Sequence, residues 1–314
     1  MKILEYKLPS TKSSKKRILT ISDLHVDNEN DLLKLSRIVN SIASSEVQYD
    51  AIIIAGDIID STNVLRRNKN VTENLIRFME YLGSIAPVYI AYASHDLAFY
   101  SEKMKVATGQ PWCSDESVFK MYFLERIAGY HNINLLSNGT DDLGDGYTLS
   151  IFNPSLEYAM LKPDGDDEVL FRESEKFKFL EILSPNNMNI IACHYPNALI
   201  SLYQKGYLTN IDLGIAGHNH SCVTQFAPLE LALKIINRPN QGLITPGKSI
   251  DIDNTKYSRD LISLDDRTNL IINPSITTFA KCSGVLNNLD GLFYEGASDI
   301  EFIPNSEYQR VRKK

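Results

Sequence analysis

RILTISDLH, residues 17–25, joins a short run rich in β-branched residues to an aspartate and a histidine directly behind it. Apolar runs of this length, bounded by polar turn formers, favour a buried β-strand over a helix. Similar runs recur at residues 51–55, 88–92, 189–192, 211–216 and 270–272. The sequence therefore predicts six short strands with little contact to solvent.

Helical spacing of apolar residues appears between and after the first strands. Four helices are expected, at residues 32–42, 75–82, 116–128 and 173–183. Asn30 or Asp31 is the expected N-cap of the first helix, and Thr72 that of the second. Strands that alternate with helices favour an α/β layer fold whose strands are buried on both faces.

Two later regions have a different pattern. Residues 135–152 carry Asn-Gly and Gly-Asp-Gly turn signals followed by alternating apolar residues, which indicates antiparallel strands and the start of a second sheet. Residues 221–267 are irregular and rich in proline and glycine, so we expect an insertion that covers the site and sets specificity. We expect one domain over residues 1–314, ending in a basic tail at 308–314.

Composition narrows the classes of function. The net charge of −7 does not favour duplex nucleic acid as a partner, because such binding relies on lysine and arginine. The four cysteines form no C-x-x-C pair, which fits a reducing cytoplasm better than a disulfide framework. Residues 1–16 are basic but lack the apolar run of a signal peptide, and we find no apolar run long enough for a membrane span, so the expected location is the cytoplasm.

Acidic and histidine side chains follow almost every predicted strand. In chain order they are Asp23, His25, Asp57, His95, Asp96, His194, His218 and His220. In open α/β sheets, ligands and catalytic groups gather beyond the carboxyl ends of the strands. A single histidine at a strand end is commonly a hydrogen-bonded structural residue, but five of the six histidines of this chain stand at such ends. The sequence thus predicts a common site.

The residue types in this set indicate metal binding. Imidazole and carboxylate ligands suit Mn, Fe, Co, Ni and Zn, whereas a structural zinc site usually includes thiolate. More candidate ligands are present than one ion needs, which favours two divalent ions that share a carboxylate. Such a pair can clamp a phosphoryl group and generate a hydroxide nucleophile at neutral pH.

The order D-x-H, G-D-x-x-D, H-D, a lone His and G-H-x-H resembles the calcineurin-like metallophosphoesterase family over residues 23–220. The resemblance implies two mixed sheets packed as a sandwich and flanked by helices, with a dinuclear centre at the strand ends. It assigns Asp23, His25 and His220 to one ion, His194 and His218 to the other, and Asp57 to both. It favours manganese among the candidate ions.

The resemblance also implies roles around the reacting phosphate. His95 would stabilise the transition state or protonate the leaving group, and Asp96 would orient His95. Asp60 would be structural. Where the family has an asparagine ligand for the second ion, this chain has Ser94, which we expect to bind weakly or through water.

The sequence gives weaker evidence for residues that contact the substrate than for the metal ligands. Arg66, Arg67 and Lys69 follow Asp57 and can meet a phosphate, although a solvated polar loop explains them more simply. Several aromatic residues lie near the motifs and can stack on a substrate or pack in the core; they are Phe99, Tyr100, Tyr195, Tyr203 and Tyr207.

The leading hypothesis is hydrolysis of a phosphomonoester or phosphodiester by a metal-bridged hydroxide. One alternative is a nuclease acting on DNA or RNA, which the acidic charge does not favour. A metal-dependent amidase or deaminase would usually open with H-x-H rather than D-x-H. A catalytically weakened metal-binding protein is the third alternative, because of Ser94. The substrate, the native ions and the oligomeric state stay open.

Overall fold

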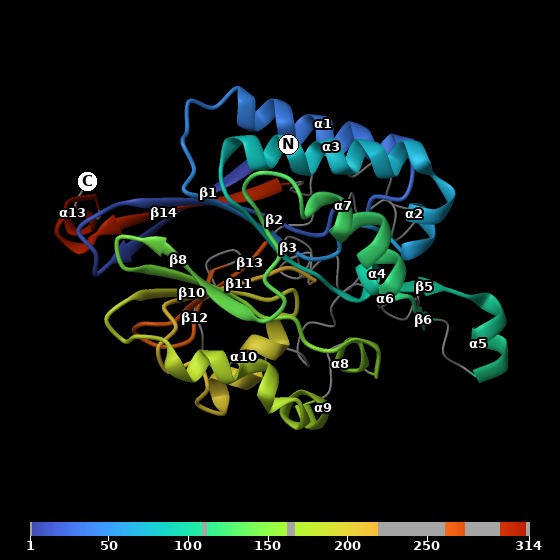
Figure 1. Ribbon diagram of the computed structural model, residues 1–314. Coiled ribbons are helices and arrows are strands. Elements are labelled where there is room, and N and C mark those ends of the chain that lie inside the picture. Colours follow the sequence, from blue (N-terminus) through green and yellow to red (C-terminus); the bar gives the residue numbers. More distant parts are fainter. Residues whose placement is uncertain (1, 109–111, 162–166, 219–260, 274–295, 312–314) are drawn as a thin grey trace, which may run out of the picture.

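A computed structural model describes residues 2–108, 112–161, 167–218, 261–273 and 296–311. Two six-stranded sheets form its centre (Figure 1). In spatial order the first contains β1 (Lys2–Ser10), β14 (Gly296–Pro304), β2 (Lys16–Ile21), β3 (Ala51–Ala55), β4 (Val88–Ala91) and β7 (Ile133–Asn134). The second contains β12 (Leu261–Ser263), β13 (Asn269–Ile272), β11 (Leu213–Ala216), β10 (Met188–Ala192), β9 (Tyr147–Ile151) and β8 (Gly139–Gly144).

Both sheets are mixed, as predicted. β2, β3, β4 and β7 run parallel in the first sheet, and β14 pairs antiparallel with β2. β9, β10, β11 and β13 run parallel in the second sheet, while β8 and β12 are antiparallel edge strands. The parallel strands direct their carboxyl ends toward one end of each sheet, where the predicted site residues follow.

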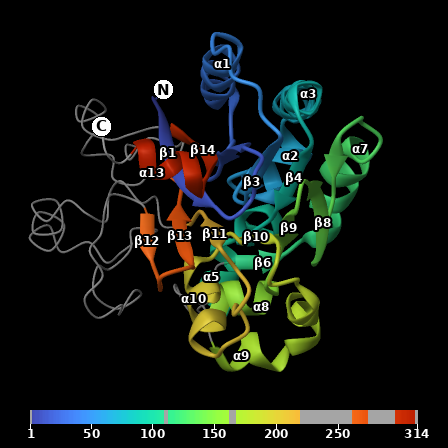
Figure 2. The ribbon, with the colours of Figure 1, turned by 90° about the vertical axis from the view of Figure 1, so that its left-hand side faces the viewer.

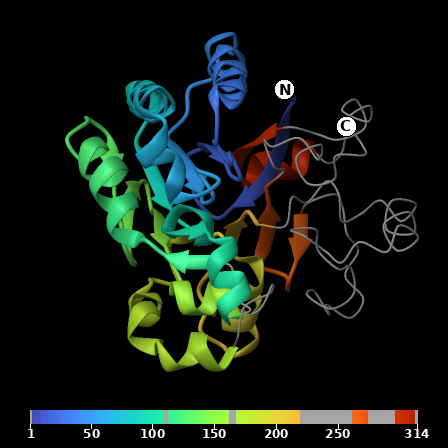
Figure 3. The same ribbon diagram turned by 90° about the vertical axis from the view of Figure 1, so that its right-hand side faces the viewer.

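The two sheets pack face to face through a buried apolar layer. Ile53 and Tyr89 of the first sheet share this layer with Leu149, Ile190 and Ile215 of the second. Ile53, Leu149, Ile190 and Ile215 are fully buried. The quarter-turn views show the two sheets stacked with helices outside each (Figures 2 and 3). The arrangement is the predicted four-layer sandwich.

Helices cover the outer faces of both sheets. α1 (Glu29–Ala43) and α3 (Lys69–Ile85) pack on the first sheet, and α8 (Leu156–Leu161), α9 (Asp167–Arg172) and α10 (Pro196–Gln204) cover the second (Figure 1). The predicted caps were wrong. Asn28 caps α1 and Asn68 caps α3, because each helix begins before its first buried apolar residue.

The other helical predictions were partly correct. Residues 116–127 are helical but contain a π-helical segment between α6 (Glu116–Phe119) and α7 (Glu125–Ile127), namely η1 (Lys120–Leu124). The helix expected at 173–183 is the 3₁₀-helix η2 (Ser174–Ile182). The remaining helices are α2 (Thr62–Arg67), α4 (Ser94–Leu97), α5 (Glu102–Thr108) and α13 (Asn305–Val311).

A small excursion leaves the body after α4. The strands β5 (Ala98–Tyr100) and β6 (Trp112–Ser114) form a separate antiparallel pair, and α5 lies beyond them at the edge of the molecule (Figure 1). Among the described helices, none combines the length and the apolar character needed to cross a membrane.

The inter-sheet layer gives a test of the fold. Ile53→Ala leaves a cavity between the sheets and is expected to lower the free energy of unfolding by about 2–5 kcal/mol. Leu33→Ala, at a position 62% exposed, should change it by less than about 0.5 kcal/mol. Urea unfolding of both variants measures the difference. Equal losses at the two positions would contradict the placement of Ile53 between the sheets.

Candidate metal centre

The segments after β2 and β3 run side by side beyond the end of the first sheet. Backbone N–H groups of Asp23 and His25 donate to the carbonyls of Gly56 and Asp57, each at 3.0 Å. Val26 and Ile59 form a further parallel bridge. The pairing of the two strands thus continues past their ends, and it holds Asp23 and His25 against Asp57.

The segments after β10 and β11 are joined in the same way. The N–H of Gly217 donates to the carbonyl of His194 at 3.0 Å, and His218 follows directly. The His218 N–H then donates to Oδ1 of Asp23 at 3.1 Å. This last bond crosses from the second sheet to the first, so the ends of both sheets form one site.

Two glycines allow the close approach of these segments. A Cβ atom on Gly56 would lie 2.6 Å from Nδ1 of His194, and a Cβ on Gly217 would lie 2.8 Å from Oδ2 of Asp23. Gly56 also has a φ of +86°, which residues with side chains rarely adopt. Steric crowding therefore explains why glycine, rather than a residue with a side chain, precedes Asp57 in the G-D motif and His218 in the G-H motif.

The predicted ligands converge on Asp57. Its Oδ2 lies 3.1 Å from Nε2 of His194 and 3.5 Å from Nε2 of His25. Ligand atoms of Asp57, His194 and His218 lie within 4.8 Å of one another, and so do those of Asp23, His25 and Asp57. Asp57 belongs to both of these groups and has two carboxylate oxygens, so it is able to serve two ions; a third such group consists of His25, Asp60 and His95.

The two ring nitrogens of His194 have different partners. Nδ1 of this ring lies 2.7 Å from the carbonyl oxygen of Ala55, which can only accept, so Nδ1 carries a proton. In a neutral ring, Nε2 then points a lone pair at the Asp57 carboxylate 3.1 Å away. Two acceptors at this distance need a proton or a metal cation between them. The residues present therefore fit a divalent ion.

The close contact between Asp57 and His194 also shifts the pKa values of both side chains. Burial lowers the pKa of His194, but the Asp57 carboxylate outweighs burial and raises it to about 9. Burial raises the pKa of Asp57, but the charges on His194, His95 and His25 bring it well below its ordinary value. The site therefore demands positive charge opposite Asp57.

The backbone at the site is strained. Asp23, His25, Asp57 and His218 all have positive φ, between +41° and +64°. Such conformations cost on the order of 1–3 kcal/mol each and persist only where surrounding contacts enforce them. Four of the six non-glycine residues with positive φ in the described structure are therefore predicted ligands, the others being Asn132 and Asp145.

Asp96 does not have the contacts that we predicted for it. Its carboxylate accepts four backbone hydrogen bonds of 2.8 to 3.2 Å, from Asp57, Ile58, Ile59 and Ala93. The expected orienting contact with His95 is replaced by one from Nδ1 of His95 to the carbonyl oxygen of Asp60, at 2.7 Å. Asp96 thus fixes the strained turn at Asp57, and the backbone of Asp60 orients His95.

Asp60 is closer to the site than its sequence position suggested. Besides its carbonyl contact with His95, its Oδ1 lies 3.5 Å from Nδ1 of His25. The rings of His25 and His95 lie edge to face with centroids 4.6 Å apart. His95 therefore borders the candidate ligands. Nothing in the sequence signalled that Asp60 contacts both rings.

Other candidates have mixed outcomes. His220 and residues 221–260 lie outside the described residues, and residues 261–263 of the predicted insertion form the edge strand β12. The predicted tail begins within α13.

Arg66 forms an ion pair with Asp115 at 3.0 Å, which agrees with a structural surface role.

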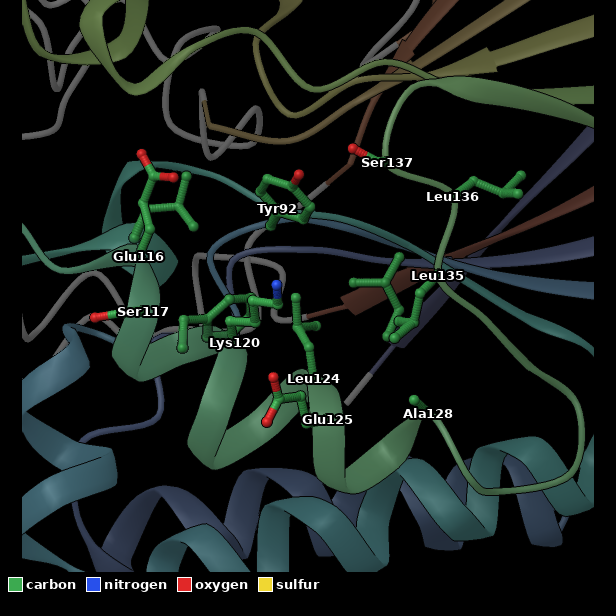
Figure 4. A pocket seen from close by; sticks show the side chains of 13 residues that line it. Tyr92, Glu116, Ser117, Lys120, Leu124, Glu125, Ala128, Leu135, Leu136 and Ser137 are labelled. Carbon is green, nitrogen blue, oxygen red and sulfur yellow. The ribbon is translucent and has the colours of Figure 1, made fainter.

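A separate pocket of about 580 Å³ lies beside η1 (Figure 4). Tyr92, Lys120 and Leu135 are among its lining residues. None of the predicted metal ligands lines this pocket, although Tyr92 and Leu97 flank the turn that contains His95 and Asp96. The candidate centre is therefore a different part of the described structure.

The buried carboxylates and imidazoles form groups that could hold a metal ion. A family model described as calcineurin-like phosphoesterase matches residues 16–222, more than half of the chain. The chain therefore belongs to the calcineurin-like phosphoesterase family, and it is a phosphoester hydrolase. A search of curated proteins found no match.

Solved structures similar to this chain include two hydrolases. Phosphopantetheinyl hydrolase from Mycobacterium tuberculosis is 11% identical with a TM-score of 0.41, and the match covers 84% of this chain and 89% of that one. A Staphylococcus aureus protein assigned as a 5'-nucleotidase, in complex with α-ketoglutarate, is 13% identical with a TM-score of 0.40. That match covers 83% of this chain and 49% of the other.

Gly56→Ala tests the close approach at the centre. The added methyl would meet the His194 ring at 2.6 Å, so the variant should lose metal affinity by at least about tenfold and melt at a lower temperature. Gly129→Ala is the control, since a Cβ there meets nothing within 4 Å. Calorimetric Mn²⁺ titration and thermal melts measure both effects. Equal behaviour of the two variants would contradict the described packing.

The affinity for metal should depend on pH through His194. Its raised pKa, about 9, means that an ion must displace the proton on Nε2 at lower pH. Mn²⁺ affinity should therefore rise about tenfold per pH unit for this one proton between pH 6.5 and 8.5. Titrations in buffers of different ionisation enthalpy count the released protons. Affinity that is flat over this range would refute the assignment.

Proposed function

We propose that this phosphoesterase acts through two divalent ions bridged by Asp57, with manganese as the favoured ion. The observation that carries the proposal is the position of Asp57 between two groups of ligand side chains. Asp23 and His25 would hold the first ion, together with His220. His194 and His218 would hold the second ion.

Two such ions would supply a nucleophile at neutral pH and offset the charge that develops on the phosphoryl group. The side chains around them have separate tasks. His95 borders the ligands, and its Nδ1 is held by the Asp60 carbonyl, so Nε2 is oriented to exchange a proton with the leaving group. Asp96 keeps the Asp57 turn in place through its four backbone contacts.

The buried geometry supports this arrangement over a single structural ion. Asp23 and His194 are fully buried and Asp57 is nearly so, and the ion pairs of these side chains join carboxylates to histidines: His25 to Asp23 and Asp57, and His194 to Asp57. A histidine that binds a metal ion is neutral, so once His25 and His194 act as ligands the buried carboxylates need cations to balance their charge. One ion would leave one of the two ligand groups without a counter-charge.

The substrate is proposed only as a class, a phosphomonoester or phosphodiester. Ser94 remains a proposed weak ligand of the second ion. Its N–H donates to the Tyr195 hydroxyl, and the next N–H, that of His95, donates to Oδ1 of Asp57 at 3.3 Å. Ser94 therefore lies at the edge of the group that would hold the second ion.

Hydrolysis after metal reconstitution tests the proposal. Wild-type protein loaded with Mn²⁺ should cleave at least one of nitrophenyl phosphate, bis-nitrophenyl phosphate, a cyclic nucleotide and single-stranded DNA. Asp57→Asn should reduce the rate by more than about a hundredfold, because even outer partners of metal ligands cost 10–100-fold.

Asp142→Asn is the matched control, since it makes the same chemical change at an exposed position of the edge strand β8. Metal analysis of the wild type should find two ions per chain. The proposal fails if no tested ion among Mn, Fe, Co, Ni and Zn supports turnover, or if Asp57→Asn retains the wild-type rate. Cleavage of DNA alone would select the nuclease alternative.

A further inference from the structure

We propose that Tyr195 is a positioning residue of the second ion, because its ring and hydroxyl fix both sides of that part of the site. The inference rests on the proposed dinuclear centre and assigns a function to a residue outside the ligand set. Tyr195 directly follows His194 and is 4% exposed, so its side chain lies inside the protein.

The Tyr195 ring packs against both imidazoles of the second ion. It meets the His194 ring edge to face, with centroids 4.8 Å apart, and the His218 ring with centroids 5.1 Å apart. The two imidazoles also contact each other, with centroids 5.2 Å apart. Three rings from the ends of β10 and β11 therefore form one cluster, and Tyr195 limits how either ligand can rotate.

The Tyr195 hydroxyl reaches the opposite sheet. It accepts a hydrogen bond of 2.8 Å from the N–H of Ser94, at the start of α4 beyond β4. The next N–H along the chain, that of His95, donates to Asp57 at 3.3 Å. Two successive amides of one turn thus bind the phenol and the proposed bridging carboxylate, so the hydroxyl sets the spacing between this turn and the histidines.

The backbone around Tyr195 is itself held in place. Tyr195 is the N-cap position of α10, and Pro196 occupies the first turn with its fixed φ. A second ring, that of Tyr158, packs edge to face on Tyr195 at 5.7 Å. The side chain therefore cannot move away without disturbing α10, and it acts as a rigid brace between the two sheets.

Tyr195→Phe separates the hydroxyl from the ring. The phenylalanine keeps the contacts with His194 and His218 but leaves the partly buried N–H of Ser94 without this acceptor. We expect the affinity for the second Mn²⁺ to fall 10–100-fold, the range typical of residues that support metal ligands. The affinity for the first Mn²⁺ should change by less than about threefold, because no described contact of Tyr195 reaches Asp23 or His25.

Calorimetric titration of metal-free protein with Mn²⁺ resolves the two binding steps without requiring turnover. Hydrogen exchange of a peptide covering residues 92–98 should be faster in Tyr195→Phe than in the wild type. Tyr147→Phe is the matched control, since it removes another buried tyrosine hydroxyl, one bonded to Ser10 and Ser14 away from the site. The control should bind both ions like the wild type.

The outcomes separate this inference from the function on which it rests. A single binding step in the wild type would refute the dinuclear centre itself. Two wild-type steps that Tyr195→Phe leaves unchanged would overturn only the role of Tyr195. Equal losses of both steps, or a melting temperature far below that of Tyr147→Phe, would make Tyr195 a general structural residue and would also overturn it.

Discussion

The contact between Asp57 and His194 is the interaction on which the rest of the site depends. It joins a carboxylate beyond the first sheet to an imidazole beyond the second, with both side chains buried. The Ala55 carbonyl fixes a proton on Nδ1, so Nε2 faces the Asp57 carboxylate and needs either a proton or a metal ion between the two atoms. A buried carboxylate opposite an acceptor is unfavourable, and this demand for positive charge is what a metal ion satisfies.

The surrounding structure holds that arrangement against its own strain. Four predicted ligands have positive φ, and Gly56 and Gly217 leave no room for a methyl group. Asp96 offsets part of the cost by accepting four backbone N–H groups at and beside the Asp57 turn. The apolar layer between the sheets, which is remote from the candidate ligands, contributes free energy of folding that offsets the strain of the ligand turns.

Predictions from sequence succeeded where a local pattern has one physical meaning. Short β-branched runs located the central strands, and residues 51–55 match β3 at both ends. Predictions failed where partners come from elsewhere in the chain. Asp96 was assigned to its neighbour His95, yet it binds the turn 39 residues earlier, and a backbone carbonyl of Asp60 orients His95. Adjacent positions at the start of a helix point in different directions, so sequence proximity misled the assignment.

The sequence by itself determined that apolar runs are followed by Asp, Gly-Asp, His-Asp and His. The apolar runs require buried strands, and the residue types that follow them favour divalent ions. Only the tertiary structure decided which of these side chains meet. The distance between Asp57 and His194 depends on how two sheets pack, and Tyr195 reaches Ser94 across 101 positions of chain. Such contacts are set by the packing of side chains between layers, which no local pattern encodes.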